Sequence, residues 1–197
     1  MTRFARRCAI VFSAAMLLAT LVPTARAGLG ENVMFFEVYP GINDPRSSAL
    51  DSALTYGVRL GGTVGTHLAV SGTLGYWETD GRASDPPVTA SIELSSWLAD
   101  ATVAYLFRPQ SRYATFALGG GIGGAFTDID GELTTEELRI TFENVRRDSF
   151  TLHAVGVALF SLSERVYLKP AVRWRWHEAR DDDKVDREFT FAVGFTF

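Results

Sequence analysis

Six charged residues occupy alternate positions in segments whose other positions are mostly apolar or small. They are Glu37, Arg59, Asp100, Lys169, Arg173 and Arg175. Alternate side chains of a β-strand point to opposite faces, so these six would share the face away from the bulky apolar residues. Cations buried without partners are costly. The spacing therefore predicts an internal network of ion pairs, either an inert filling or a site for gating or ligand binding.

Residues 166–177 carry the densest part of this pattern, because Lys169, Arg173 and Arg175 alternate there with bulky apolar residues. The core of a soluble β-sandwich could not hold three such cations without a heavy desolvation cost. The polar interior of a membrane β-barrel can hold them. The segment therefore favours a barrel whose interior is polar.

The last eleven residues, 187–197, show the clearest strand pattern. Their bulky face consists of Phe189, Phe191, Val193, Phe195 and Phe197. Their other face consists of Thr190, Ala192, Gly194 and Thr196. A strand of about ten residues that is apolar outward and small or polar inward is typical of a lipid-facing strand in a membrane barrel. We expect the phenylalanine face to contact hydrocarbon.

Eight segments alternate in this way. They are residues 32–40, 54–61, 67–76, 92–107, 113–126, 149–160, 166–177 and 187–197. Connections are long after the first, third, fifth and seventh segments and short after the second, fourth and sixth, as in bacterial barrels with short periplasmic turns. Eight strands enclose an interior that side chains can fill. The sequence therefore predicts an all-β fold, an eight-stranded antiparallel up-and-down transmembrane β-barrel without an open pore.

Several details follow from the same alternation. Residues 78–90 and 127–148 are expected to be long loops, although residues 138–145 could extend the second as a hairpin. The inward and outward positions are expected to exchange near Ser95 and Ser96. Glu37 favours an inward face for the odd positions of the first strand, and the sixth strand is apolar on both faces, which leaves its orientation open.

Residues 1–27 have the composition of an export signal. Arg3, Arg6 and Arg7 precede an apolar run, and Ala25 and Ala27 frame a small-residue cleavage site. Residues 28–197 would then form one barrel domain without cysteine. Removing four arginines from 19 basic residues leaves 15 against 23 acidic residues, a net charge of −8. An acidic protein is a poor partner for nucleic acid.

The closing strand and the terminal Phe197 resemble those of the outer-membrane β-barrel family, with OmpA/OmpX-like and OmpW-like β-barrel domains as the most similar members. The resemblance implies that Phe189, Phe191, Phe195 and Phe197 act as a signal for the barrel-assembly machinery. It also implies a monomer in the bacterial outer membrane, surrounded by lipid and lipopolysaccharide, that contributes to membrane integrity. An OmpW-like conduit for small hydrophobic solutes and a loop-mediated adhesin remain open alternatives.

Enzymatic activity is the least favoured alternative. Lipid A deacylases, barrels of similar size, use a histidine and a serine two residues apart, but His177 is followed at that spacing by Ala179. His67 and His153 have no serine or acid at a helpful spacing. Because nucleophilic catalysis needs a base beside its nucleophile, we expect no enzyme and no cofactor.

Two acidic runs, residues 128–132 and 181–186, could bind calcium or bridge lipopolysaccharide through divalent ions. Neither has the spacing of an EF-hand loop, so the ordinary interpretation is solvated loop charge and no bound metal. The glycines of residues 119–124 are not followed by the lysine of a phosphate-binding loop, and they fit the curvature of a small barrel.

Overall fold

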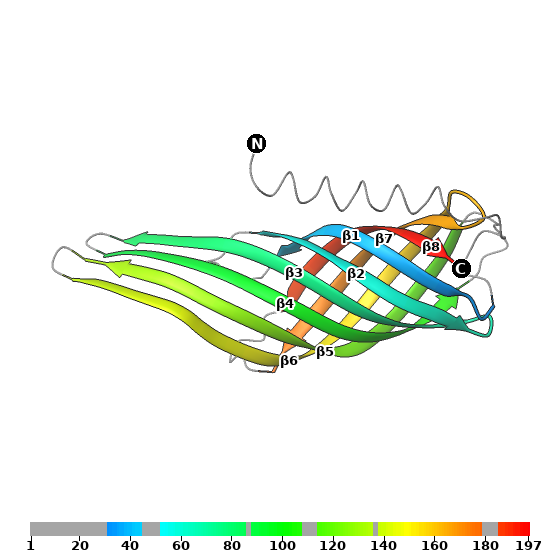
Figure 1. Cartoon of the computed structure of the whole chain (residues 1–197), viewed down its shortest axis with the longest axis horizontal. Helices are drawn as coiled ribbons and strands as arrows, with labels where there is room; N and C mark the ends of the chain where they lie inside the picture. The colour runs from blue at the N-terminus through cyan, green and yellow to red at the C-terminus, as the bar shows by residue number, and fades with distance from the viewer. Residues whose placement is uncertain (1–30, 45–51, 86–87, 108–113, 136–137, 179–184) are drawn as a thin grey trace.

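The computed structural model describes residues 31–44, 52–85, 88–107, 114–135, 138–178 and 185–197, so the predicted signal peptide lies outside the described residues. Eight strands form one closed antiparallel barrel in chain order (Figure 1). The strands are β1 (Met34–Asp44), β2 (Ala53–Val64), β3 (Leu68–Asp85), β4 (Val88–Phe107), β5 (Ala114–Thr134), β6 (Arg139–Ser161), β7 (Val166–His177) and β8 (Asp186–Thr196). The predicted eight-stranded up-and-down barrel is confirmed. No helix in the described ranges is long and apolar enough to cross a membrane.

The barrel closes where β8 pairs with β1, with Phe195 opposite Phe36 and Phe189 opposite Ile42. We call the end that holds Phe197 and the connections β2–β3, β4–β5 and β6–β7 the turn end. The opposite end, where β1–β2, β3–β4, β5–β6 and β7–β8 connect, is the loop end. The two ends differ in shape, because β3 to β6 continue far beyond the other strands at the loop end (Figure 1).

The outer wall is bulky and apolar. Its exposed side chains include Leu54, Leu60, Leu74, Ile122, Phe150, Phe189 and Phe191. Phe195 keeps the register of this outer face, but it is only 8% exposed, whereas Phe191 is 47% exposed. Phe195 therefore lies on the face that alternation predicts, although most of its surface is covered, because alternation predicts the face of a side chain and not its exposure.

The predicted loops at residues 78–90 and 127–148 are mostly strand. β3 pairs with β4 as far as Asp85 opposite Val88, and β4 pairs with β5 as far as Thr89 opposite Thr134. β5 pairs with β6 as far as Thr134 opposite Arg139, with a bulge near Ile129. These four strands form a projecting sheet, which we define as residues 79–94 and 128–148. The loop prediction failed because polar and apolar residues are mixed along these strands and the strict alternation of the barrel wall is lost. The predicted hairpin extension at 138–145 is confirmed.

The projecting sheet carries ion pairs of its own. Arg139 Nη2 donates to Glu132 at 2.8 Å, and the Thr134 hydroxyl donates to the same carboxylate at 2.9 Å. These hydrogen bonds hold the pKa of Glu132 below its ordinary value, and the bond from Arg139 has the larger effect. A lowered carboxyl pKa stabilises the fold above the ordinary pKa, and this contribution is lost as the pH falls through the lowered one.

The predicted exchange of faces near Ser95 and Ser96 does not occur. β4 pairs with β3 and with β5 without any register shift, so Ser96, Leu98 and Asp100 all point inward and are buried. The mistake came from Ile92 and Leu94, apolar residues that share the inward register of Ser96. Leu94 packs against a small inner cluster that includes Trp77, Leu98 and Ala125.

The burial of their side chains determines the orientation of the two strands that the sequence left open, β1 and β6. In β1, Phe35, Glu37 and Tyr39 are buried, as Glu37 suggested. In β6, Thr151 and His153 are buried, whereas Phe150 and Leu152 are exposed. The interior therefore receives a histidine from β6 that the sequence did not place there.

The glycines of β5 provide space for these inner side chains. A Cβ on Gly121 would lie 2.7 Å from the imidazole ring of His153, and a Cβ on Gly123 would overlap the Asp100 carboxylate. Such distances are well below van der Waals contact, so any larger residue would displace a lumen side chain. The glycine run thus lets β4 and β6 fill the interior.

Candidate functional site: the charged lumen

The lumen is filled in layers. At the turn end, an apolar plug blocks the interior; it consists of Phe35, Ala69, Leu106, Ala117, Leu159 and Tyr167. Toward the loop end, a second apolar cluster lines the wall formed by β2 to β5; it consists of Ala53, Trp77, Leu98 and Ala125. The charged side chains lie between these two clusters, and Ser149, His177 and Asp186 lie near the loop end on β6, β7 and β8. The structure brings all six predicted charged residues into this interior.

Glu37 is the centre of the first charged cluster and is fully buried. Arg59 Nη1 donates to its Oε2 at 2.6 Å, and Lys169 Nζ donates to both carboxylate oxygens at 2.7 and 2.9 Å. The Tyr167 hydroxyl donates to Oε1 at 2.7 Å. Two cations therefore share one carboxylate, which gives this cluster an excess of one positive charge.

Asp100 is the centre of the second charged cluster. Its Oδ2 accepts hydrogen bonds from Arg173 Nη1 at 2.8 Å and from Arg175 Nη2 at 2.6 Å. Because Asp100 lies on β4 and both arginines lie on β7, these bonds cross the lumen. Glu188 on β8 lies 3.2 Å from Arg173 and 3.9 Å from Arg175. Two carboxylates and two guanidinium groups give a neutral cluster.

The register of the strands explains which charges meet. Glu37 lies directly opposite Arg59 on the neighbouring strand, and Arg173 lies directly opposite Glu188. Opposite charges at such positions attract across a strand pair. Arg59 also donates from Nε to Thr73 at 3.0 Å, so its guanidinium is fixed from two sides.

Three residues of this site were not among those predicted. Glu188 has the inner parity of Thr190, and Tyr167 that of Lys169, so the alternation could have identified both. His153 sits opposite Arg175, and its Nε2 is 2.9 Å from the Thr102 hydroxyl. Its position required the orientation of β6, which the sequence left open.

A small cavity of about 30 Å³ lies beside the plug, lined by Arg59, Lys169 and Arg173 and by apolar residues such as Leu106. A volume of this size is enough for a water molecule or two and not for a ligand. The geometry is that of a filled interior in which each of the four cations is paired with a carboxylate. Among the described residues, no group of three or more His, Cys, Asp or Glu is placed to bind a metal ion.

The outer wall carries aromatic side chains near both ends of the barrel. Toward the loop end, Tyr76 lies between Tyr56 and Trp97, with ring centroids 5.4 and 5.1 Å apart. Toward the turn end, Tyr105 packs against Phe107 at 4.9 Å. Two such groups separated by aliphatic residues match the aromatic girdles found at the two interfaces of a membrane.

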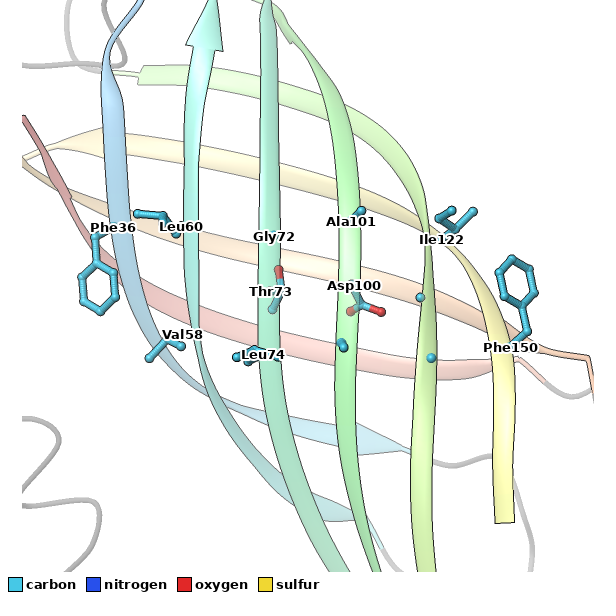
Figure 2. A pocket seen from close by; sticks show the side chains of 13 residues that line it. Phe36, Val58, Leu60, Gly72, Thr73, Leu74, Asp100, Ala101, Ile122 and Phe150 are labelled. Carbon is cyan, nitrogen blue, oxygen red and sulfur yellow. The ribbon is translucent and has the colours of Figure 1, made fainter.

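Between these groups, the outer wall has an open apolar groove of about 580 Å³. Figure 2 shows Phe36 and Leu60 on one side and Ile122 and Phe150 on the other, with Gly72 and Ala101 between them. The floor is low because these central residues have little or no side chain. The groove is apolar, as a surface in contact with acyl chains should be.

No protein-family model matches the chain, and no curated protein matches its sequence. Solved structures do match. The N-terminal β-barrel domain of OprF from Pseudomonas aeruginosa has a TM-score of 0.54 at 13% identity, covering 85% of this chain and 99% of that one. OprG, an outer membrane protein of the same organism, has a TM-score of 0.55 at 12% identity, covering 86% and 98%.

Ail, the attachment invasion locus protein of Yersinia pestis, has a TM-score of 0.51 at 10% identity, covering 86% of this chain and 100% of that one. At such low identity, these likenesses concern the fold. Each match spans nearly the whole of the other chain, so the agreement covers the complete barrel. The chain therefore has the fold of small bacterial outer-membrane β-barrels.

Proposed function

We propose that the protein is an integral barrel of the bacterial outer membrane whose filled lumen makes it a structural component of that membrane and not a pore. The observation that carries this proposal is the reversal of polarity in the wall. Leucine, isoleucine and phenylalanine face outward, while four cations and three carboxylates are buried inside in ion pairs. Hydrocarbon outside and fixed charge inside is stable only in lipid.

In this proposal, the turn end faces the periplasm and the loop end faces the outside, because bacterial barrels have short periplasmic turns. Lipid and lipopolysaccharide contact the outer wall, and the barrel-assembly machinery recognises the closing strand with Phe189, Phe191, Phe195 and Phe197. The barrel acts as a monomer. A conduit for hydrophobic solutes would need an apolar passage, whereas the charged clusters and the plug occupy the lumen.

Electrophoretic mobility tests the membrane-barrel proposal. Unheated protein in detergent should migrate faster than boiled protein, because a closed barrel stays compact in sodium dodecyl sulfate. In planar bilayers, the same preparation should give no open-channel conductance, because the plug and charged clusters fill the lumen. A chain that stays soluble without detergent after removal of residues 1–27 would contradict the proposal. Steady channel openings would contradict only the proposal that the lumen is filled, and not the membrane location.

The projecting sheet supports attachment as a second function. It carries four paired strands far beyond the barrel wall (Figure 1), and Ail, which has the same fold, is the attachment invasion locus protein of Yersinia pestis. Paired strands hold a binding surface in a fixed shape, which reduces the entropy lost on binding.

Shortening the projecting sheet tests attachment. Glu78 lies opposite Ser95 and Asp128 lies opposite Arg146, so two-residue Asn-Gly turns can join each pair in place of residues 79–94 and 129–145. We expect cells carrying this variant to lose adhesion while the protein keeps its fast migration on gels. A matched control changes Glu164 and Arg165 to alanine at the turn end, where adhesion should be unaffected. Equal adhesion by the shortened variant would remove this function.

A further inference from the structure

The polar group at the loop end joins a serine, a histidine and an aspartate. Ser149 Oγ is 3.2 Å from His177 Nδ1, and His177 Nε2 is 2.8 Å from Asp186 Oδ2. Both ring nitrogens are thus engaged, one by a hydroxyl and the other by a carboxylate. A nucleophile beside a base that a third group orients is the arrangement used in nucleophilic catalysis.

Three consecutive strands hold this group. Ser149 is on β6, His177 ends β7 and Asp186 begins β8. The backbone is fixed at this point, because Thr151 lies opposite His177, Arg175 lies opposite Asp186, and the Glu178 N–H donates to the Phe150 carbonyl at 3.1 Å. The side chains of His177 and Asp186 are 14% and 7% exposed, and Ser149 is half-buried. The hydroxyl is therefore the accessible member of the group.

Charge neutralisation does not account for His177. Arg173 and Arg175 are already balanced by Asp100 and Glu188, so the cluster around Asp100 is neutral without it. Because a carboxylate accepts and does not donate, the Nε2–H of His177 points to Asp186. That tautomer leaves the Nδ1 lone pair facing the Ser149 hydroxyl, which is the protonation state a general base needs.

We propose that Ser149, His177 and Asp186 form a serine-hydrolase site at the loop end that cleaves carboxylic esters. Ser149 Oγ attacks the ester carbonyl, and its proton passes to His177 Nδ1. The C–O bond of the ester then breaks, and the departing alkoxide takes that proton to leave as an alcohol. Water, deprotonated by His177 Nδ1, attacks the acyl-Ser149 ester, and the acid is released with Ser149 restored. Asp186 is a positioning residue that holds the imidazole.

The neighbouring inner wall indicates the class of ester. Ser149 lies opposite Ala125 on β5, and Ala125 lies opposite Leu98 on β4. These two residues form an apolar cluster with Trp77. The surface beside the nucleophile therefore suits the apolar acyl group of an ester that enters from the loop end. This activity goes beyond the structural role proposed above and does not depend on it.

Covalent labelling tests the site. Folded protein in detergent is treated with a fluorophosphonate probe, and the adduct is located by mass spectrometry. We expect one adduct on Ser149, its loss in S149A, and a labelling rate about 100-fold lower in H177Q, since general-base catalysis contributes roughly that much. S96A is the control, because Ser96 is another serine on the inner face near this end but bonds to Thr127. It should be labelled like the original protein.

Hydrolysis of p-nitrophenyl butyrate tests whether Asp186 positions the imidazole for catalysis or only stabilises the fold. D186N should lower the hydrolysis rate, and D186E should restore part of it with a shifted pH–rate profile, whereas a purely structural contact would leave the profile in place. Gel mobility identifies folded protein for each variant. Absence of an adduct on folded original protein, or an adduct that persists in S149A, would overturn the proposal. Neither result affects the outer-membrane proposal, which is tested separately by gel mobility and conductance.

Discussion

Replacing Glu37 with leucine should destabilise the folded barrel by about 3–5 kcal/mol, the usual cost of removing one partner from a buried ion pair. The substitution leaves Arg59 and Lys169 without the carboxylate that accepts from both, and it removes the acceptor of the Tyr167 hydroxyl. Unfolding in urea, followed by tryptophan fluorescence of protein in lipid vesicles, measures the change.

Two further variants show whether the lost charge is the cause. E37Q keeps the volume and one acceptor oxygen, so it should cost less than E37L but still weaken the fold. E93L makes the same chemical change at an exposed position of the projecting sheet, where substitutions usually alter stability by less than about 0.5 kcal/mol. Equal effects of E37L and E93L would mean that the Glu37 cluster contributes no stability.

Replacing Asp100 with leucine should also cost about 3–5 kcal/mol, because Arg173 and Arg175 would then share Glu188 alone. Adding R173M should relieve much of this loss, since the remaining Arg175 and Glu188 balance one another. The double variant should therefore be less destabilised than the sum of the two single variants, with a coupling of about 0.5–3 kcal/mol. The same unfolding measurement applies.

A second pair provides the control for that coupling. Arg59 bonds to Glu37 and Thr73 and shares no ion-pair partner with Asp100, so D100L and R59M should add to within about 0.5 kcal/mol. If D100L couples as strongly to R59M as to R173M, the lumen behaves as a single network and not as two clusters. If the folded variant with both D100L and R173M conducts ions, the charged cluster around Asp100 helps to close the lumen.

Alternation was sufficient to predict the barrel because lipid on one side and packed side chains on the other impose a strict period of two on every strand. Beyond Glu78 and Asp128 the strict alternation of apolar and polar residues is lost, so the strands of the projecting sheet were predicted to be loops. Leu94 caused a similar error, since an apolar residue that packs on the inner face resembles a change of register.

The site was predictable as a set of residues but not as a set of partners. Neighbouring-strand pairs such as Glu37 with Arg59 follow once the register is known. Asp100 reaches Arg173 and Arg175 from β4 to β7, and such contacts depend on how far the strands are staggered around the barrel. Ser149 was missed for a related reason. It precedes His177 by 28 residues, and a pair so far apart in the sequence is visible only when the pairing of β6 with β7 is known.

The projecting sheet has two lateral edges, one along β3 beyond Glu78 and one along β6 before Phe150, where no neighbouring strand of the described chain pairs with it. Open edges of this kind invite strand addition between molecules, which leads to polymers. The β6 edge carries Arg139, Arg146, Arg147 and Asp148, and charges along an edge oppose such growth. These edge charges therefore oppose the joining of projecting sheets from neighbouring molecules into a continuous fibre.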